Sequence, residues 1–379
     1  MQFTVDRDTL SQALGATSRA TASRVIQPIL ANVLLTTTAD NQLQLTGTDL
    51  DFTIQTHIPL ESVTTQGTTT LPAKKLAEIF AKLPSGQPVS ITVDSATQNA
   101  TLRSGNSVFE LKAMPAEDFP VTPDVSTLGT TFQVGLPALL QGIQQTAFAA
   151  ANFETNNVLG GVFVKLSSGM LEMAATDGSR LARAMEAFTG SGSVEEISAV
   201  IPVRVLQDVA KLCGSNIAAD AMVSITLNDR QIAFQTPQFL VISRLLEGQY
   251  PQYQQLIPAT NKIIVRAKRK SLMESLDRTA VMANERTNVV KMMFDPTSQE
   301  LRLEANTPDQ GGSQDSMPVE FSDAEPLHIA FNYKFLLDAL KVIESDDIRM
   351  ETNGALAPTV FKDGIKDNYL CLVMPVQVK

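Results

Sequence analysis

The chain has 379 residues, which predicts two to three domains, and its 44% apolar content excludes wholesale disorder. Lys and Arg number 30 against 40 Asp and Glu, so the net charge of −10 excludes a uniformly basic nucleic-acid binder, although a locally basic face remains compatible with it. Two cysteines and two histidines exclude a disulfide framework and a histidine-rich metal or catalytic site, and no apolar run has the length of a membrane span.

Several segments of the first third recur twice further along the chain. The first third opens with a strand that runs into a helix (3–14), followed by an alternating strand (43–49), a helix (74–83) and another strand (89–93). The same order returns at 132–143, 171–177, 204–212 and 223–227, and again at 263–276, 301–307, 334–342 and 348–350. Each third also closes alike, at 109–120, 240–251 and 371–376. A threefold repeat in one order predicts three similar units.

The second helix of each unit carries a basic residue at one recurring position. Lys74, Arg204 and Lys334 are spaced 130 residues apart. In the first of these helices, Leu76, Ile79, Phe80 and Leu83 form one apolar stripe at helical spacing, so the basic residue belongs to a helix that packs on a core.

These patterns predict three α+β domains, each with two helices laid on antiparallel sheet and about eight strands. The predicted boundaries are 1–125, 126–255 and 256–379, with linkers at 120–130 and 252–262. The polar stretch Asp309–Ser316 is expected to be a mobile surface loop.

The predicted helical regions are net positive although the whole chain is acidic. If all the helices line one face, that face is basic and suits a polyanion, while the sheet face repels it. The alternative is that Lys and Arg are simply good helix formers, and the charge alone does not decide between the two. The recurring basic position favours the functional interpretation.

Catalytic and cofactor motifs are absent from the sequence. It contains no GxxxxGK[ST] phosphate loop, no GxGxxG, no GxSxG and no HExxH. Asp49 and Asp51 form a D-x-D that is typical of a turn more often than of a metal site, and His57 and His328 fit strand positions. Cys213 and Cys371 lie in apolar runs and are expected to be buried thiols in a reducing compartment. No metal and no cofactor are expected, and a binding or scaffolding role is favoured.

Several motifs resemble one family, the bacterial β sliding clamps, which are the processivity subunits of DNA polymerase III. The resemblance covers the whole chain and is strongest at LTGTDLD (45–51), ATDGSRLA (175–182), GQYPQY (248–253) and VMPV (373–376), with RVIQPILANVLL (24–35) in support. It implies a head-to-tail homodimer that closes a ring of six units around duplex DNA, with helices lining the hole. It also implies a non-catalytic protein without cofactors.

The resemblance carries over to three groups of residues. The DNA-facing group is Arg24, Lys74, Arg204 and Lys334. The dimer interface is Phe109 and Leu111 on one edge and Val281 and Met282 on the other, although all four also fit ordinary core positions. A peptide-binding cleft is implied at Leu159, Thr176, Gly178, Arg180, Leu181, Pro251, Gln255, Leu256, Pro358, Met374, Pro375 and Val376. The sequence departs from the family pattern at Asn157 and Val158, at Ser179 and in the tail Gln377-Val378-Lys379.

The partners implied by the resemblance are double-stranded DNA without sequence preference, a clamp loader, and the polymerase III alpha subunit with other polymerases and repair proteins that dock through short peptides. A cytoplasmic location at replication forks follows, because the opening MQFTVDRD is no signal peptide. Two alternatives remain: an oligomeric scaffold that binds short peptides but not DNA, and an enzyme with an unrecognised site.

Overall fold

The fold is described from a computed structural model, which describes residues 1–22, 27–152, 157–167, 169–187, 196–214 and 217–377. Its α-helices are α1 (Arg7–Thr17), α2 (Ala73–Lys82), α3 (Leu136–Thr146), α4 (Val203–Cys213), α5 (Arg269–Ala280) and α6 (Tyr333–Lys341). Helices α2, α4 and α6 begin 130 residues apart, which confirms the repeat predicted for them. None of the helices in the described part of the chain has the length and apolar content needed to cross a membrane.

Strands supply most of the remaining regular structure, and every strand pairing among the described residues is antiparallel. The first third holds β1 (Gln2–Asp6), β2 (Asn32–Thr37), β3 (Gln42–Thr48), β4 (Phe52–Pro59), β5 (Ser62–Thr65), β6 (Thr68–Pro72), β7 (Pro88–Asp94), β8 (Asn99–Ser104) and β9 (Ser107–Lys112). The second holds β10 (Thr130–Gly135), β11 (Gly161–Ser167), β12 (Met170–Thr176), β13 (Arg180–Ala187), β14 (Ile197–Pro202), β15 (Met222–Leu227), β16 (Gln231–Gln235) and β17 (Phe239–Arg244). The third holds β18 (Ile263–Lys268), β19 (Val289–Asp295), β20 (Glu300–Thr307), β21 (Gly311–Pro318), β22 (Glu320–Phe321), β23 (Leu327–Asn332), β24 (Asp347–Thr352), β25 (Thr359–Asp363) and β26 (Tyr369–Val373).

Two compact units can be distinguished. The first is built mainly from Met1–Leu136 and Gln207–Leu245, and the second from Pro137–Thr189, Ser193–Leu206 and Leu246–Lys379. The first unit contains the sheets β5-β1-β7-β8-β9 and β10-β15-β16-β17-β4-β3-β2-β6. The second contains β14-β11-β12-β13-β26-β25-β24-β18-β22 and β21-β20-β19-β23. Each long sheet therefore joins strands from two successive thirds of the chain, through β4 with β17 and through β13 with β26.

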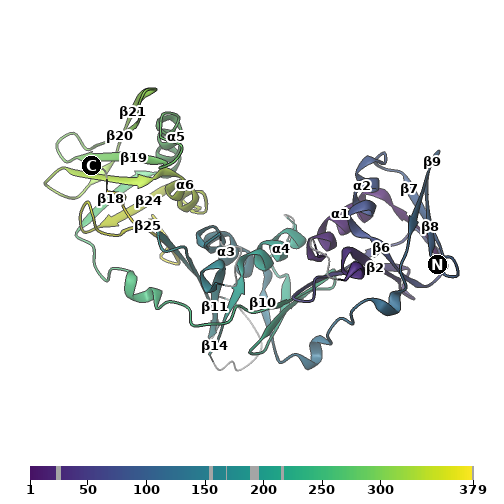
Figure 1. The fold of residues 1–379 in the computed structure, drawn as a ribbon. Helices are drawn as coiled ribbons and strands as arrows, with labels where there is room; N and C mark the ends of the chain where they lie inside the picture. Colours follow the sequence, from purple (N-terminus) through teal and green to yellow (C-terminus); the bar gives the residue numbers. More distant parts are fainter. Residues whose placement is uncertain (23–26, 153–156, 168, 188–195, 215–216, 378–379) are drawn as a thin grey trace. The chain divides into compact units, whose positions relative to one another are not determined.

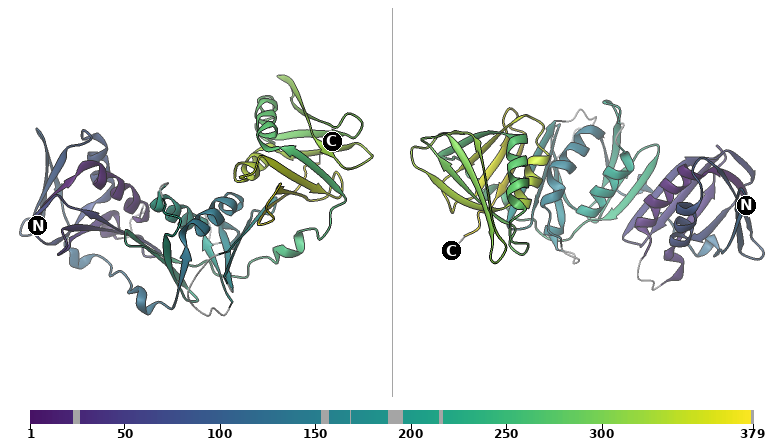
Figure 2. Two further views of the ribbon diagram at one scale, coloured as in Figure 1. Left: turned by 180° about the vertical axis from the view of Figure 1, so that it is seen from behind. Right: turned by 90° about the horizontal axis from the view of Figure 1, so that it is seen from above.

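Helices α1 and α2 lie together against the strands of the first third (Figure 1). Leu10 and Leu14 on α1 meet Leu76 and Phe80 on α2 in one buried cluster. The predicted apolar stripe of α2 is thus confirmed as the buried side of the helix, and the arrangement of helices on antiparallel sheet is the predicted α+β class. Helices α5 and α6 contact each other in the last third (Figure 2).

Helix α1 begins after Asp6, whose side chain accepts a hydrogen bond from a backbone N–H group of the first turn that has no partner within the helix. Asp6 Oδ1 accepts hydrogen bonds from the Thr9 backbone N–H (2.8 Å) and from the Thr9 hydroxyl (2.6 Å). These bonds, the hydroxyl bond first, hold the pKa of Asp6 below its usual value. Asn332 caps α6 in the same way, by accepting from the Lys334 N–H at 3.0 Å.

The prediction of a mobile loop at Asp309–Ser316 is wrong. Only the turn before Gly311 is irregular, and the rest is strand β21, which pairs with β20 along its length. Side chains fix it further: Arg278 on α5 forms an ion pair with Asp315 (2.7 Å), and the Ser313 hydroxyl donates to the Thr279 carbonyl (2.6 Å). Composition misled the prediction, because backbone pairing needs no apolar side chains on a strand with one exposed face.

Candidate functional site

The turn between β12 and β13 is held by the side chain of Asp177. Its Oδ1 accepts from the backbone N–H groups of Ser179 (2.9 Å) and Arg180 (3.0 Å), while the Thr176 hydroxyl donates to the Arg180 carbonyl at 2.6 Å. Gly178 takes φ +89°, a conformation that side-chain-bearing residues rarely adopt, and it is exposed. The ATDGSR motif is therefore a closed turn with an open surface at the glycine.

Arg180 at the start of β13 is committed to partners within the protein. Its Nε lies 3.1 Å from Asp177 Oδ2, its Nη1 lies 2.7 Å from Asp338 Oδ2, and its Nη2 donates to the Phe148 carbonyl at 2.6 Å. The guanidinium also stacks 4.4 Å from the ring centroid of Phe335. The side chain is 11% exposed, so this cation is a nearly buried tie between β13 and helix α6.

The end of β26 lies directly beside this turn. The Met374 N–H donates to the Ser179 carbonyl at 2.9 Å, and Arg180 pairs with Val373 in the sheet. Thr359 also pairs with Val373, which brings the preceding residue, Pro358, to the same place. Met374 remains 40% exposed despite these neighbours.

An aromatic cluster lies under the turn. Tyr250 and Tyr253 pack with Leu181 in one core, and the Tyr250 hydroxyl accepts from the Thr176 N–H at 3.2 Å. Burial raises the pKa of Tyr250 to about 12, so it stays a neutral hydroxyl. The following 3-10 helix (Tyr253–Leu256) ends with Leu256 at 54% exposure, an apolar side chain left facing solvent beside the cluster.

Val376 connects this region to a hollow of about 540 Å³ in the last third of the chain. The Val376 N–H donates to the Ala330 carbonyl of β23 at 2.8 Å. The hollow is also lined by Met293, His328 and Leu356, and Leu356 is 66% exposed. An apolar surface thus continues past the end of β26.

The predicted interface residues lie on or near two outermost strands of the sheets, β9 and β21. In β9, Phe109 and Leu111 are half-buried and pack on the core of the first unit, whereas Val108 is 50% exposed. In the second unit, Val281 follows helix α5 at 79% exposure, and the Met282 carbonyl accepts from the Thr307 hydroxyl at 2.9 Å, next to β21.

The recurring basic residues have equivalent positions. Lys74, Arg204 and Lys334 are each the second residue of their helix, and all three side chains are exposed. Arg24 lies outside the described residues. The structure thus presents each of the three described cations on the solvent side of an amphipathic helix.

Comparison with known proteins shows the family to which the chain belongs. Models of the DNA polymerase III beta subunit match it in three parts: the N-terminal domain over 1–123, the central domain over 134–252 and the C-terminal domain over 254–377. The chain belongs to this family. It is 35% identical to the beta sliding clamp of Synechococcus elongatus and 30% identical to that of Bacillus subtilis, with full coverage of both chains in each case.

Solved clamps have the same fold. The Pseudomonas aeruginosa clamp, in a structure bound to griselimycin, matches over the full length of both chains with a TM-score of 0.89 and 29% identity. The clamp of Bacillus subtilis matches equally completely, with a TM-score of 0.88. The chain is therefore a sliding clamp of three clamp domains, as the motifs suggested.

Within this clamp, the cleft residues predicted from sequence divide into two groups. Thr176, Gly178, Arg180, Leu181, Pro358 and Met374 meet at the β12–β13 turn through the contacts described above. Leu159, Pro251, Gln255, Leu256, Pro375 and Val376 lie on the adjoining segments, all of them at least partly exposed. Leu159 belongs to the 3-10 helix (Val158–Gly160), where Val158 packs against the aromatic cluster.

Other residues of the clamp were missed by the sequence analysis. Asp338 and Phe335 hold the Arg180 guanidinium, and Leu356 extends the apolar surface. The recurrence of an acidic residue at positions 78, 208 and 338 was visible in the sequence, but nothing in the pattern indicated that only the third would pair with Arg180.

The residues considered for catalysis occupy structural positions. Asp49 Oδ1 accepts from the Asp51 and Phe52 N–H groups, at 3.1 and 2.8 Å, so the predicted turn is confirmed. His57 on β4 is half-buried, and burial lowers its pKa. Among the described residues, no group of three or more His, Cys, Asp and Glu is placed to hold a metal ion.

The thiols differ from expectation in one respect. Cys371 is buried, as predicted, but Cys213 is only half-buried at the end of α4. Burial raises the pKa of Cys213 to about 11 and that of Cys371 to about 12, so both stay protonated and weakly nucleophilic at neutral pH.

Proposed function

We propose that this protein encircles duplex DNA as a homodimeric ring and tethers the replicative DNA polymerase to its template. It is a non-catalytic processivity subunit: the closed ring prevents escape, so no tight or sequence-specific DNA contact is needed. The proposed clamp domains are 1–125, 126–255 and 256–379. The single observation that carries the ring is the way successive repeats share a sheet.

The repeats join by one rule. The fourth strand of the first repeat, β4, pairs with the last strand of the second, β17, and the equivalent strand β13 pairs with β26, the last strand of the third. The equivalent strand of the third repeat, β21, and the last strand of the first, β9, are outermost strands of their sheets. If β21 of one protomer pairs with β9 of its partner, a fourth strand again pairs with a last strand. Two such pairings close a head-to-tail dimer.

Side chains near these edges support the proposed contact. Phe109 and Leu111 on β9, and Val281 and Met282 after α5, give the apolar character that a permanent contact requires. Val281 is the most exposed of the four, at 79%, so it is the one most available to a partner.

The proposed DNA-facing residues are Arg24, Lys74, Arg204 and Lys334. Lys74, Arg204 and Lys334 are supported by their equivalent, exposed helical positions. Replacing these three with alanine should leave the ring intact but reduce loading onto DNA and flatten its salt dependence.

The proposed peptide cleft is the surface around the β12–β13 turn. Gly178 leaves it open, Met374 offers an adaptable apolar contact, and Leu256 and Val376 extend it on either side. Arg180 is held in place beside this cleft, because its Nε, Nη1 and Nη2 each already donate to a group of the protein. The proposed occupants are short peptides of the polymerase III alpha subunit, the clamp loader, and other polymerases and repair proteins.

The cellular site that follows is the cytoplasm, at replication forks on the nucleoid. The proposal rests on the role in DNA replication of the family and on the requirement that the ring meet chromosomal DNA.

Retention on circular DNA tests the function. The protein is loaded onto nicked circular plasmid with a matching clamp loader, ATP and Mg²⁺, half of the sample is linearised, and both are passed over a sizing column in high salt. Protein should stay with circles and leave linear molecules, because the link is topological. Loss from both, while a control clamp is retained on circles, would support the alternative of a scaffold that does not encircle DNA.

A further inference from the structure

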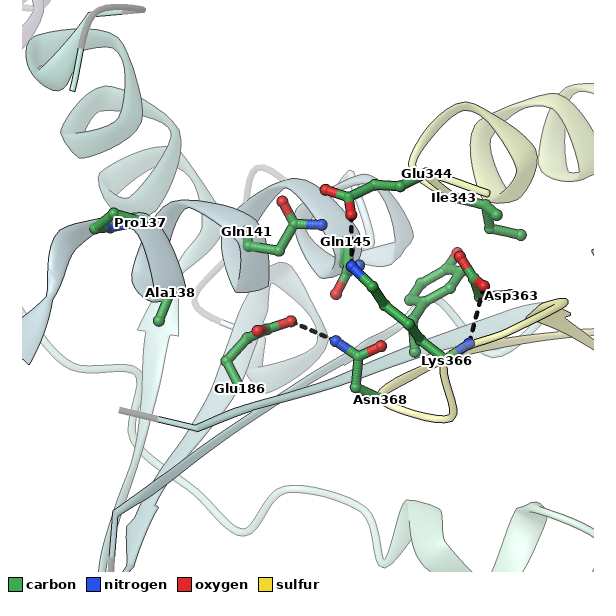
Figure 3. A pocket seen from close by; sticks show the side chains of 11 residues that line it. Pro137, Ala138, Gln141, Gln145, Glu186, Ile343, Glu344, Asp363, Lys366 and Asn368 are labelled. Carbon is green, nitrogen blue, oxygen red and sulfur yellow. Dashed lines mark hydrogen bonds and ion pairs between the residues drawn. The ribbon is translucent and has the colours of Figure 1, made fainter. Parts of the chain in front are cut away.

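A cavity of about 280 Å³ lies beside helix α3 in the second unit and takes no part in the surfaces described above. Gln141 and Gln145 on α3, Glu186 on β13, and Glu344, Lys366 and Asn368 from the last third contribute its polar lining (Figure 3). At ~30 Å³ per water molecule in the liquid, it has room for several waters or one small organic group.

The side chain of Gln145 is the first indication that the cavity is a binding site. Gln141 and Gln145 stand one helical turn apart, so they share the face of α3 that borders the cavity. Gln145 is among the side chains that line the cavity, and Figure 3 labels it there. Gln145 is 4% exposed, and its Oε1 accepts no hydrogen bond from any described residue. A buried carbonyl oxygen without a donor is unfavourable, and a ligand that donates a hydrogen bond to it would remove that cost.

The excess of acidic residues in the cavity lining is the second indication of a binding site. Of the described residues that line the cavity, Glu186, Glu344 and Asp363 are acidic and only Lys366 is basic, with its Nζ 2.8 Å from Glu344 Oε2. Among the described residues, Glu186 Oε1 accepts only from the neutral amide of Asn368, at 2.8 Å. The end of helix α6, just before Ile343, adds partial negative charge. The cavity therefore favours a cation.

Burial raises the pKa of Glu186, and the Asn368 hydrogen bond and the Lys366 charge offset this only in part. In the part of the chain that the structure describes, the carboxylate thus lacks a full counter-charge. A second cation next to Glu186 would stabilise its ionised form.

We propose that this cavity binds a guanidinium group, with Gln145 Oε1 and the Glu186 carboxylate accepting its N–H donors and Lys366 acting as an internal competitor. A guanidinium offers several donors in one plane and is weakly hydrated, so it leaves water at lower cost than an ammonium group. Pro137 and Ile343 provide apolar walls for such a flat group. The site is independent of the proposed DNA and peptide surfaces.

Titration calorimetry with L-argininamide at neutral pH and low salt tests the site. L-lysinamide, which has the same charge but an ammonium head, is the matched probe. Saturable binding of argininamide alone is expected, and equal binding of lysinamide would overturn the guanidinium assignment. A capped Gly-Arg-Gly peptide distinguishes the sources: binding assigns the group to an arginine of a protein partner, and failure assigns it to a free small molecule.

Single substitutions are expected to change the affinity for argininamide in opposite directions. Gln145→Leu should weaken argininamide binding at least ~10-fold, whereas Gln144→Leu, on the exposed side of the same helix, should leave it unchanged. Lys366→Met should tighten binding, because it removes the competitor. If Gln145→Leu fails to fold, Glu186→Gln is used in its place, with the same expected loss. Absence of saturation at about 10 mM argininamide, or wild-type binding by the folded variant, would overturn the proposal.

Discussion

Two equivalent turns in this clamp have the same backbone and different surfaces. In the β3–β4 turn Asp49 caps the backbone, and in the β12–β13 turn Asp177 does so. Each turn accepts a backbone N–H from the end of the neighbouring last strand: Arg244, the last residue of β17, donates to the Asp51 carbonyl at 3.0 Å, and Met374, directly after β26, donates to the Ser179 carbonyl at 2.9 Å. The repeat therefore conserves the junction between successive repeats, independently of what the junction binds.

The side chains separate the two junctions. Arg244 and Asp51 form an ion pair in which both side chains are 67% exposed, so the first junction presents charge to solvent. At the second junction the arginine, Arg180, is nearly buried, at 11% exposure. The position equivalent to Arg244 is held by an apolar residue, Met374, which is exposed. An apolar docking surface thus arises at one junction only, through the exchange of a few residues on a shared backbone.

The largest expected effect concerns the buried cation. Arg180→Met should lower the free energy of unfolding by about 3 kcal/mol, because it leaves Asp177 and Asp338 without their counter-charge. The partial exposure of Asp338, at 35%, limits the loss. Chemical denaturation measures it. Arg244→Met is the control and should change stability by less than about 1 kcal/mol, as exposed pairs do; equal losses would show that the two junctions are energetically alike.

Next in size is the effect on docking. Met374→Arg gives the second junction the charge of the first, and it should weaken binding of a clamp-binding polymerase peptide at least ~30-fold, since an apolar contact is replaced by a charge that must be desolvated. Fluorescence anisotropy measures the affinity. Arg244→Met alters the equivalent position elsewhere and should leave peptide binding unchanged. Unaltered affinity in Met374→Arg would place the cleft elsewhere.

A smaller effect is expected at the third copy of the junction, where β21 pairs with β20 on one side and has no strand on its outer side among the described residues. Val281→Asp should weaken the proposed dimer about tenfold by placing a charge in an apolar contact. Sedimentation velocity over a dilution series measures this. Val121→Asp, at 92% exposure between the first two thirds, is the control. A dimer that survives both substitutions equally would exclude Val281 from the interface.

The smallest expected effect on stability concerns one position that differs between the two turns. Leu50 has φ +80° where the second turn has Gly178 at φ +89°. Leu50→Gly relieves this strain and should raise the free energy of unfolding by less than about 1 kcal/mol, since added chain entropy opposes the gain. Gly178→Ala should lower it by about 1 kcal/mol, although a Cβ there meets open space. Thermal unfolding measures both, and a loss of stability in Leu50→Gly would show that Leu50 contributes contacts that outweigh its strain.

Much of this fold followed from sequence alone. The strand-to-helix openings, the alternating strands and the helices α2, α4 and α6 lie where local periodicity predicted them, because helix and strand patterns depend on neighbours within a few residues. The motif LTGTDLD likewise predicted a turn at Asp49, since an Asp side chain caps the backbone two and three residues ahead.

Tertiary structure decided what the pattern left open. It made Asp309–Ser316 mostly a strand, because pairing with β20 depends on a distant backbone. It also buried Arg180 against Phe335 and Asp338, and it left Gln145 Oε1 without a donor among the described residues, in a cavity that residues from the last third of the chain help to line. Such contacts depend on which surfaces meet after folding, whereas periodicity records only which side of an element faces inward.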